Sequence, residues 1–275
     1  MRTTYIKKVF GLVKGFIPFY LFTLLLFLMS CSHIDEGDRL IYVEPTVPNN
    51  RVSRCVLLED FTGQRCVNCP KANDEIHALQ QQYGADSVIA VAIHSGPLGF
   101  HTNAKFLGLS TDTGDEYYNH WGLEYQPVGL VNRGLPTEYT TWNTRIREEL
   151  QKPAPVRIDI ALLNHDKDQF TVRADVEGID GTVLGHLQLW VVEDNVTAFQ
   201  LMPDGSRNDT YLHQHVFRTA LNGTWGEEMT VKEGEHSVTG SYTLKIPAEW
   251  KIDDLAIIAF LYNDPGVLQV RKIEI

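Results

Sequence analysis

The sequence predicts an α/β region followed by an antiparallel β-sandwich. In the first region, residues 51–152, continuously apolar runs alternate with apolar residues at helical spacing, which is typical of parallel strands and the helices between them. In the second, residues 153–275, apolar and polar residues alternate with a period of two, as in half-buried strands. Turn sequences separate these runs, and about seven strands in about 120 residues favour a sandwich of immunoglobulin-like type.

Residues 1–30 have the composition of a secretory targeting segment. Four basic residues and no acidic residue precede or accompany an apolar run from Phe16 to Met29, which is too short for a membrane span and suits a signal sequence. The last residues, Leu28 to Cys31, resemble the bacterial lipobox, in which the cysteine is lipidated and becomes the mature N-terminus. We therefore predict a lipoprotein anchored to a membrane through Cys31. Cleavage by a general signal peptidase and a retained N-terminal anchor are the alternatives.

The chain is acidic, with a formal net charge of −11. Without residues 1–30, which hold four of the 24 basic residues and none of the 35 acidic ones, 20 basic residues face 35 acidic ones and the charge becomes −15. This balance disfavours nucleic acid and anionic lipid surfaces as partners. No glycine-rich phosphate loop and no serine-nucleophile elbow occurs, and no cofactor is predicted.

Residues 31–50 are predicted to form a flexible tether. They contain several acidic residues, prolines and asparagines, and apart from a short apolar stretch at residues 40–43 they show no periodicity. Such a segment would hold the following domain away from a membrane.

The α/β region begins with a predicted strand, helix and second strand. The apolar run Val56–Phe61 predicts the first strand and residues 87–93 predict the second, which implies a right-handed crossover. Between them, Pro70 suits the first turn of a helix and Gly84 suits its end. Two helical stripes support helices in this region: Ala72, Ile76, Leu79 and Tyr83, and later Trp142, Ile146 and Leu150.

The β region follows a proline-rich segment, residues 152–155, which is predicted to be a linker. The main predicted strands cover residues 156–160, 170–176, 187–192, 241–246, 255–262 and 267–273.

Two cysteines three positions apart, Cys66 and Cys69, lie where the first strand turns into the helix. At this spacing their thiols can form a disulfide with each other, and the unpaired N–H groups and dipole of the helix N-terminus favour the thiolate of Cys66. In an extracytoplasmic chain such a pair is suited to exchanging electrons with the cysteines of other proteins. Cys55 is predicted to be a small buried hydrophobe, with a structural bond to either cysteine as the alternative.

The segment from Asp60 to Cys69 resembles the active-site region of the thioredoxin family. In that family a buried acid at the position of Asp60 assists proton transfer to and from the second cysteine. Pro127, at a predicted strand start, resembles the cis-proline that faces the cysteines and whose preceding backbone pairs with a substrate strand. The resemblance implies a thioredoxin-like fold for residues 51–152 and catalytic roles for Cys66, Cys69, Asp60 and Pro127.

The segment also departs from the thioredoxin pattern. Arg65 replaces the aromatic residue that usually precedes the first cysteine, and Val67-Asn68 replaces the usual Gly-Pro pair. Because the intervening residues tune the redox potential, the direction of electron flow stays open.

The chain after Ser30 further resembles the twenty-eight-kilodalton outer-membrane-protein family of lipoproteins from Gram-negative bacteria. The resemblance rests on the lipobox and four later segments: residues 59–70, 127–133, 213–218 and 222–227. It implies an outer-membrane lipoprotein, facing the periplasm or the cell surface, with a thioredoxin-like domain followed by a β-domain. That family has no well-defined activity, so the resemblance informs architecture and location more than reaction.

Other interpretations of the candidate site residues stay open. An extracytoplasmic disulfide can be inert and merely pin the strand–helix turn. A zinc ion bound by both cysteines with His94 or His120 would lack a second clear ligand pair, so no metal is predicted. His213 and His215 are two residues apart, a spacing that would place both side chains on one face of a strand. They could bind a transition metal together with a third ligand, but we favour a polar sheet face beside Arg218.

Two hypotheses for function follow. The leading one is a thiol–disulfide oxidoreductase at the outer membrane, whose partners are extracytoplasmic protein thiols and disulfides: Cys66 attacks, Cys69 resolves, Asp60 moves the proton and Pro127 aligns the partner. The rival is a binding lipoprotein whose α/β half is only a scaffold. The aromatic-rich segment before Pro127, residues 94–121, and the β-domain motivate it, because that segment could either line a groove or pack on the core.

Overall fold

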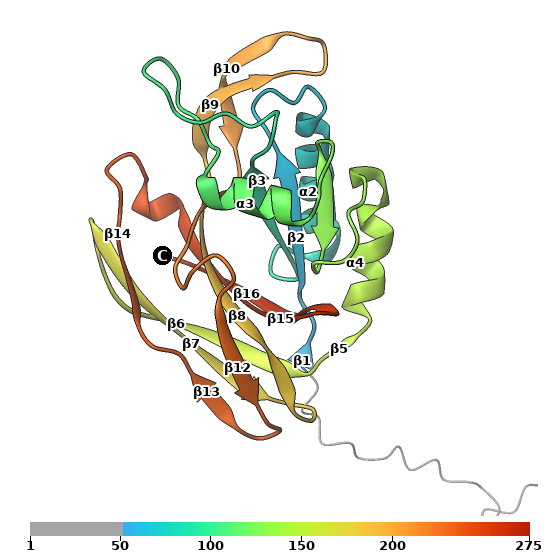
Figure 1. Cartoon of the computed structure of the whole chain (residues 1–275), viewed down its shortest axis with the longest axis vertical. Helices are drawn as coiled ribbons and strands as arrows, with labels where there is room; N and C mark the ends of the chain where they lie inside the picture. The colour runs from blue at the N-terminus through green and yellow to red at the C-terminus, as the bar shows by residue number, and fades with distance from the viewer. Residues whose placement is uncertain (1–51) are drawn as a thin grey trace, which may run out of the picture. The chain divides into compact units, whose positions relative to one another are not determined.

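The structure, a computed structural model, describes residues 52–275 of the chain (Figure 1). The predicted targeting segment (residues 1–30), the lipidated Cys31 and the tether (residues 31–50) lie outside the described residues. Among the residues that are described, every helix is too short or too polar to cross a lipid bilayer.

The first half repeats the predicted order of strand, helix and strand: β2 (Val56–Thr62), α2 (Cys69–Tyr83) and β3 (Val88–His94). The strands β2 and β3 are parallel neighbours, and all their residues are buried. The continuously apolar sequence before His94 predicts this for β3, whereas β2 also buries Glu59 and Asp60. In α2 the predicted apolar stripe faces the core, and Ala72, Ile76 and Leu79 are buried. The helix ends at Gly84, whose φ of 93° favours glycine.

The rest of the first half adds an edge strand and two helices: α3 (Asp112–His120), β4 (Val128–Val131), a 3-10 turn η2 (Tyr139–Thr141) and α4 (Trp142–Leu150). Strand β4 pairs with β2 in antiparallel orientation. Helices α2 and α4 share one core with the strands, in which Trp142 and Ile146 are fully buried. Gly129 in β4 makes this packing feasible, because a Cβ there would lie 2.5 Å from the indole of Trp142.

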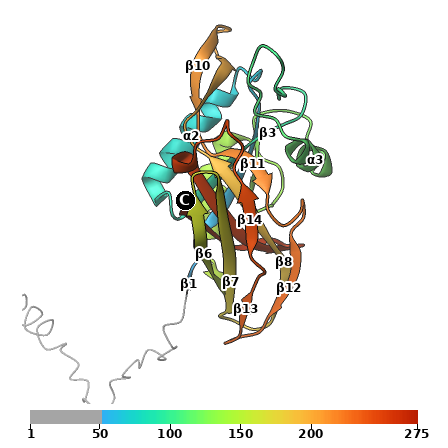
Figure 2. The same cartoon turned by 90° about the vertical axis from the view of Figure 1, so that its left-hand side faces the viewer.

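The second half is built of strands, most of them antiparallel. In chain order they are β5 (Pro153–Ala154), β6 (Val156–Asp166), β7 (Gln169–Gly178), β8 (Val183–Glu193), β9 (Val196–Leu201), β10 (Arg207–His213), β11 (Val216–Ala220), β12 (Glu227–Val231), β13 (His236–Val238), β14 (Tyr242–Lys245), β15 (Leu255–Asn263) and β16 (Gly266–Glu274), with a 3-10 turn η3 (Ile252–Asp254) before β15. Four of them, β6, β7, β13 and β14, form a separate sheet (Figure 2).

One mixed sheet of eight strands runs through both halves, in the order β16-β15-β8-β11-β3-β2-β4, with β12 also paired to β8. The junction is a parallel pairing of β11 with β3, at Val216 and Ala92, where the Ala92 N–H also donates to the carbonyl of His215 at 2.8 Å. The fold is thus a mixed α/β sheet followed by antiparallel β-sheets, which confirms the predicted fold class at that level.

Strands β8 and β15 are buried on both faces. Along β8, Leu189 and Val191 contribute to the core shared with the four-stranded sheet, whereas Trp190 and Val192 contribute to the core shared with β2, β3 and α3. The side chains of a strand alternate between faces, so a continuously apolar strand can join two cores. The halves are therefore held together by apolar side chains as well as by strand pairing.

A buried ion pair lies in the core between the halves. Glu59 in β2 accepts a hydrogen bond from Nε of Arg133, just after β4, at 3.4 Å, and both side chains are at most 2% exposed. Burial raises the pKa of Glu59, and the charge of Arg133 opposes that rise. The Arg133 guanidinium also lies within 6.0 Å of the ring centres of five aromatic residues: Tyr117, Trp190, Trp225, Phe260 and Tyr262.

One local prediction is wrong, and the division into domains at residues 152–155 stays a prediction. In that proline-rich segment β5 pairs in antiparallel orientation with β1 (Val52–Ser53). His213 and His215 do not share one strand face, because His213 is the last residue of β10 and His215 sits in the connection to β11 with a φ of 57°. Alternation alone did not reveal that the strand ends between them.

Replacing Arg133 with methionine is expected to lower the free energy of unfolding by about 3–5 kcal/mol, because Glu59 would stay buried without its cation. Denaturant titration at neutral pH measures the loss. The matched control is Lys232→Met, which removes an ion pair to Glu235 between side chains that are 65% and 56% exposed. The control should change stability by about 0–1 kcal/mol. Equal losses in the two variants would contradict a structural role for the buried pair.

Candidate functional site

The predicted cysteine pair forms a disulfide at the N-terminus of α2. Cys66 and Cys69 are joined, with their Cα atoms 5.4 Å apart, and Cys69 is the first residue of the helix. Both cysteines are at most 3% exposed, whereas Arg65 and Val67 beside them are exposed. The disulfide therefore lies directly beneath the protein surface. The remaining described cysteine, Cys55, is buried and unpaired, as predicted for a small hydrophobe.

Asp60 is buried on the helix side of β2, in a small cavity that Cys69 also lines. The cavity measures about 20 Å³. The Asp60 carboxyl is 2% exposed, its Oδ1 has no hydrogen-bond partner, and burial raises its pKa to about 8. At neutral pH this group is therefore mostly protonated. A protonated carboxyl beside the second cysteine can give its proton to a thiolate that forms there.

Pro127 lies just before β4 and outside this cavity. The Gln126–Pro127 peptide bond is cis, and Pro127 leads into β4. The Gln126 side chain donates to the carbonyls of Thr62 and Ser95, at 2.6 and 2.8 Å, and so ties the ends of β2 and β3 together. Pro127 is buried but does not line the cavity that holds Asp60 and Cys69.

A hairpin from the second half braces the cysteine turn, and sequence reasoning missed it. Strands β9 and β10 pair only with each other and lie beside this end of β3 and α2 in Figure 1. The Gln200 side chain in β9 donates to the carbonyl of Cys66 at 2.8 Å, and the Leu201 N–H donates to the carbonyl of Gln64 at 2.9 Å. The turn at Asp204-Gly205, flanked by alternating residues, was the available signal for this hairpin.

Two histidines meet beside Asp60, one from each half. Nε2 of His94, at the end of β3, lies 3.3 Å from Nδ1 of His213, at the end of β10. Both residues line the same cavity and are at most 5% exposed. Burial holds the pKa of His94 well below its ordinary value and lowers the pKa of His213 to about 4, so both rings are neutral at pH 7.

His215 and His120, the other histidines considered as metal ligands from the sequence, do not line this cavity. His215 pairs with Asp194 at 2.9 Å, and His120 lies on α3 against Trp225, with ring centres 4.3 Å apart. A zinc site formed by both cysteines and His120 would therefore need residues that this structure keeps apart. Within residues 52–275, no group of three or more His, Cys, Asp or Glu side chains is placed to hold a metal ion.

The aromatic-rich segment before Pro127 divides into two parts. Tyr117 and Tyr118 of α3 are buried in the core. Phe100 and Phe106 instead contact Phe199 of the hairpin, with ring centres 5.1 and 5.8 Å apart. The Arg65 guanidinium lies 4.9 Å from the ring centre of Phe100, so the arginine beside the disulfide rests on this aromatic group.

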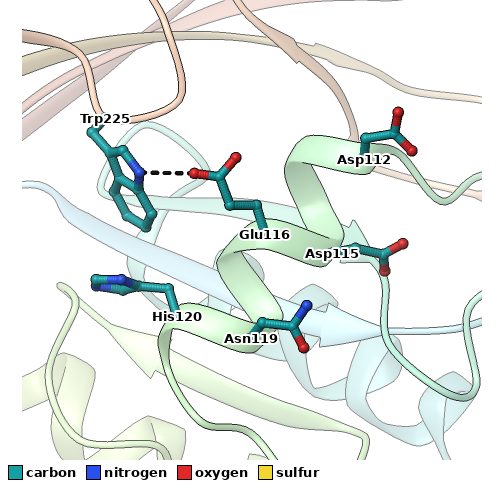
Figure 3. A pocket seen from close by; sticks show the side chains of 6 residues that line it. All are labelled: Asp112, Asp115, Glu116, Asn119, His120 and Trp225. Atoms are coloured by element: carbon teal, nitrogen blue, oxygen red, sulfur yellow. Dashed lines mark hydrogen bonds between the residues drawn. The ribbon is translucent and has the colours of Figure 1, made fainter.

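A larger hollow of about 660 Å³ lies along the outer side of α3, lined by Asp112, Asp115, Glu116, Asn119, His120 and Trp225 (Figure 3). The Trp225 indole N–H donates to Glu116 at 2.9 Å. None of these residues lines the cavity beside Cys69. Because its best-placed polar groups already bond to each other, we assign the hollow to the contact between α3 and the β11–β12 connection.

A comparison with protein families identifies the chain. The family model described as outer membrane protein Omp28 matches residues 114–275. The chain belongs to the Omp28 family. This confirms the family that the sequence resembles. The matched range begins after Cys69, so membership is established independently of the cysteine pair.

The fold of this Omp28-family protein resembles that of a solved structure. HBP35 of Porphyromonas gingivalis matches with a TM-score of 0.63 and 16% identity, over 81% of this chain and 76% of that chain. A domain of the outer membrane lipoprotein Omp28 from the same organism matches with a TM-score of 0.32 and 22% identity, over 44% of this chain and 88% of that chain. No curated protein sequence gives a significant match. At these identities the likeness to HBP35 shows the fold alone.

Replacing Asp60 with asparagine is expected to stabilise the protein relative to wild type increasingly as the pH rises. In the unfolded chain this carboxyl ionises near pH 3.8, whereas in the folded protein it keeps its proton until about pH 8. Between these values the folded state binds one more proton than the unfolded state. This group alone therefore lowers wild-type stability by about 1.4 kcal/mol for each pH unit.

Urea titrations of both proteins, from about pH 4 to about pH 8, check this expectation. The difference between the two proteins at each pH cancels the contributions of other titrating groups, such as Glu59, His94 and His213. A difference that stays constant over this range would show that Asp60 ionises normally in the folded protein.

Proposed function

We propose that this protein is a thiol–disulfide exchange lipoprotein of the outer membrane that acts through Cys66 and Cys69. One observation carries the proposal: the disulfide opens α2 directly beside a buried carboxyl that keeps its proton at neutral pH. A disulfide that only pinned the turn would have no use for a proton donor behind its second cysteine.

The roles of the residues follow from their positions. In the reduced protein, the positive end of the α2 dipole would favour a thiolate at Cys66, which attacks a disulfide of the partner. Cys69 then attacks the Cys66 sulfur of the mixed disulfide and releases the partner's thiol. Asp60 gives its proton to Cys69 when the pair is reduced, and its ionised form takes the proton back when Cys69 attacks. Pro127 and the backbone before it align the partner chain.

The finer fold assignment belongs to the same proposal. The order β2-α2-β3, followed by a cis-proline and the antiparallel strand β4, supports a thioredoxin-like first half. The four-stranded sheet packed on β8 and β15 supports an immunoglobulin-like sandwich in the second half.

The proposed partners are extracytoplasmic proteins with thiols or disulfides, met by a protein that is tethered to the membrane through a lipid on Cys31. Family membership supports the outer membrane as the location. The acidic composition supports protein rather than nucleic acid as the partner class.

One observation favours the rival function, a binding lipoprotein with an inert disulfide. Cys66 and Cys69 are only 2% and 3% exposed, and Gln200 fastens the Cys66 carbonyl to the hairpin. An attacking thiol must therefore reach the sulfur through a narrow approach. In the rival function the disulfide would only hold the turn, and the surface around it would bind a partner without chemistry.

The first test is trapping of mixed disulfides. In cells, Cys69→Ser should accumulate disulfide-linked adducts with envelope proteins that disappear on reduction, because Cys66 can attack but nothing resolves the product. Cys66→Ser, which leaves only Cys69, is the matched control and should trap none. The purified wild-type pair should also equilibrate with a glutathione buffer.

Absence of both adducts and glutathione exchange would end the redox proposal. The rival is supported if the Cys66→Ser/Cys69→Ser protein also keeps its normal surface interactions.

A second test concerns the anchor. Cys31→Ser is expected to abolish incorporation of labelled palmitate and to move the protein out of the membrane fraction. Ser32→Ala, next to it, is the control and should leave both unchanged. Palmitate labelling that survives Cys31→Ser would rule out lipidation at this residue.

A further inference from the structure

The cavity beside Cys69 contains polar atoms that the disulfide alone does not explain. Asp60 Oδ1, His94 Nδ1 and His213 Nε2 are buried, and none of them makes a well-formed hydrogen bond within the protein, although backbone carbonyls lie near both rings, that of Ala92 near His94 and those of Ala198 and Phe199 near His213. All three residues line this cavity, together with Cys69. Leaving a buried polar atom unpaired costs about 1–3 kcal/mol. Three such atoms around one cavity of about 20 Å³ indicate a functional arrangement.

The two histidines are arranged to pass a proton between their outer nitrogens. A neutral imidazole has one nitrogen that donates and one that accepts. Nε2 of His94 and Nδ1 of His213 face each other at 3.3 Å, which leaves His94 Nδ1 and His213 Nε2 as the free ends of the pair. A proton accepted at one free end can therefore be matched by a proton released at the other.

We propose that His94 and His213 form a proton relay that connects Asp60 with the outside of the protein during thiol–disulfide exchange. The relay deepens the proposed function and rests on it for its physiological use. His213 belongs to β10, so the second half would supply part of the redox chemistry of the first.

When a dithiol reduces the Cys66–Cys69 disulfide, the relay supplies the proton that Asp60 gives up. A thiolate of a dithiol attacks Cys66, the Cys66–Cys69 bond breaks, and Cys69 leaves with the electron pair and takes the proton of Asp60. The second thiol of the dithiol then gives its proton to solvent and displaces Cys66, which leaves as the thiolate, so the dithiol is oxidised and the pair gains two electrons and, on Cys69, one proton. The Asp60 carboxylate regains its proton from His94, which receives one from His213, which receives one from a water molecule that enters the cavity from solvent. Reoxidation sends the proton out by the same route and restores both tautomers.

The charged and titratable groups around the pair are compatible with neutral relay rings. Asp60 on β2, Cys69 on α2 and Tyr211 on β10 line the same cavity. On β11, Arg218 lowers the pKa of both histidines further, although burial is the larger cause. The Arg218 charge is itself paired with Glu193, at 2.6 Å. The rings can therefore change tautomer without holding a buried positive charge.

The test measures how fast dithiothreitol reduces the purified, folded protein near pH 7, by alkylating the freed thiols at intervals. His213→Gln keeps a polar side chain that cannot relay a proton, and it should slow reduction by about tenfold or more. Its equilibrium constant against dithiothreitol should stay within about twofold, because a relay changes the rate and not the end states. His215→Asn, on the neighbouring connection and outside the cavity, is the matched control and should keep the wild-type rate.

The relay is overturned if His213→Gln reduces at the wild-type rate, or if its rate and equilibrium constant change together, as a purely structural role predicts. Wild-type protein supplies a second measurement should the variant fail to fold. Its reduction should be about twofold slower or more in heavy water, and a rate ratio near one would overturn the relay.

The reduction experiment tests the relay and the trapping experiment tests the proposed function, so one can be contradicted without the other. Slow reduction of His213→Gln with neither trapped adducts nor glutathione exchange keeps the relay and removes the proposed function. Trapped adducts with an unaffected His213→Gln rate keep the function and remove the relay. A folded wild-type protein whose disulfide resists dithiothreitol would remove both.

Discussion

The buried pair of Glu59 and Arg133 is the interaction on which the rest of the structure depends. Arginine does not lose its proton in a protein, so its burial between the halves requires a counter-charge, and Glu59 supplies it. The aromatic rings from β8, β15 and the β11–β12 connection enclose this cation, which fixes the first half against the second. Asp60, the next residue, points to the opposite face of the same strand, where no cation accompanies it. Two neighbouring carboxyls thus serve different purposes: one holds the halves together, and the other holds a proton beside the disulfide.

The second half takes part in building the site. Its hairpin fastens the cysteine turn through Gln200 and brings His213 to the cavity. The junction of β11 with β3 places that hairpin at the end of the strand that carries His94. The site is therefore assembled from segments more than 100 residues apart in the chain, although its cysteines and its acid are local.

Sequence patterns predicted the elements far better than their partners. Strands β2 and β3, helices α2 and α4 and six of the twelve strands of the second half were predictable, because alternation and helical stripes report which residues of an element are buried. The disulfide followed from the spacing of Cys66 and Cys69, whereas the buried position of Asp60 was implied by the resemblance to the thioredoxin family. The parallel contact between Val216 and Ala92, the meeting of His94 with His213 and the aromatic surroundings of Arg133 were not predictable. A periodic pattern shows that a face is covered, but it does not identify the element that covers it.

The junction between β3 and β11 has a consequence for how this protein can be divided. In an isolated first half, the backbone N–H and C=O groups of β3 on the side of β11 would become an open sheet edge, flanked by the apolar residues that now meet β8 and β15. Exposed apolar edges of this kind recruit strands from other molecules and lead to aggregation. The two halves therefore cannot be exchanged as independent modules, and a redox domain trimmed at residue 152 would need a substitute for β11 and the core behind it.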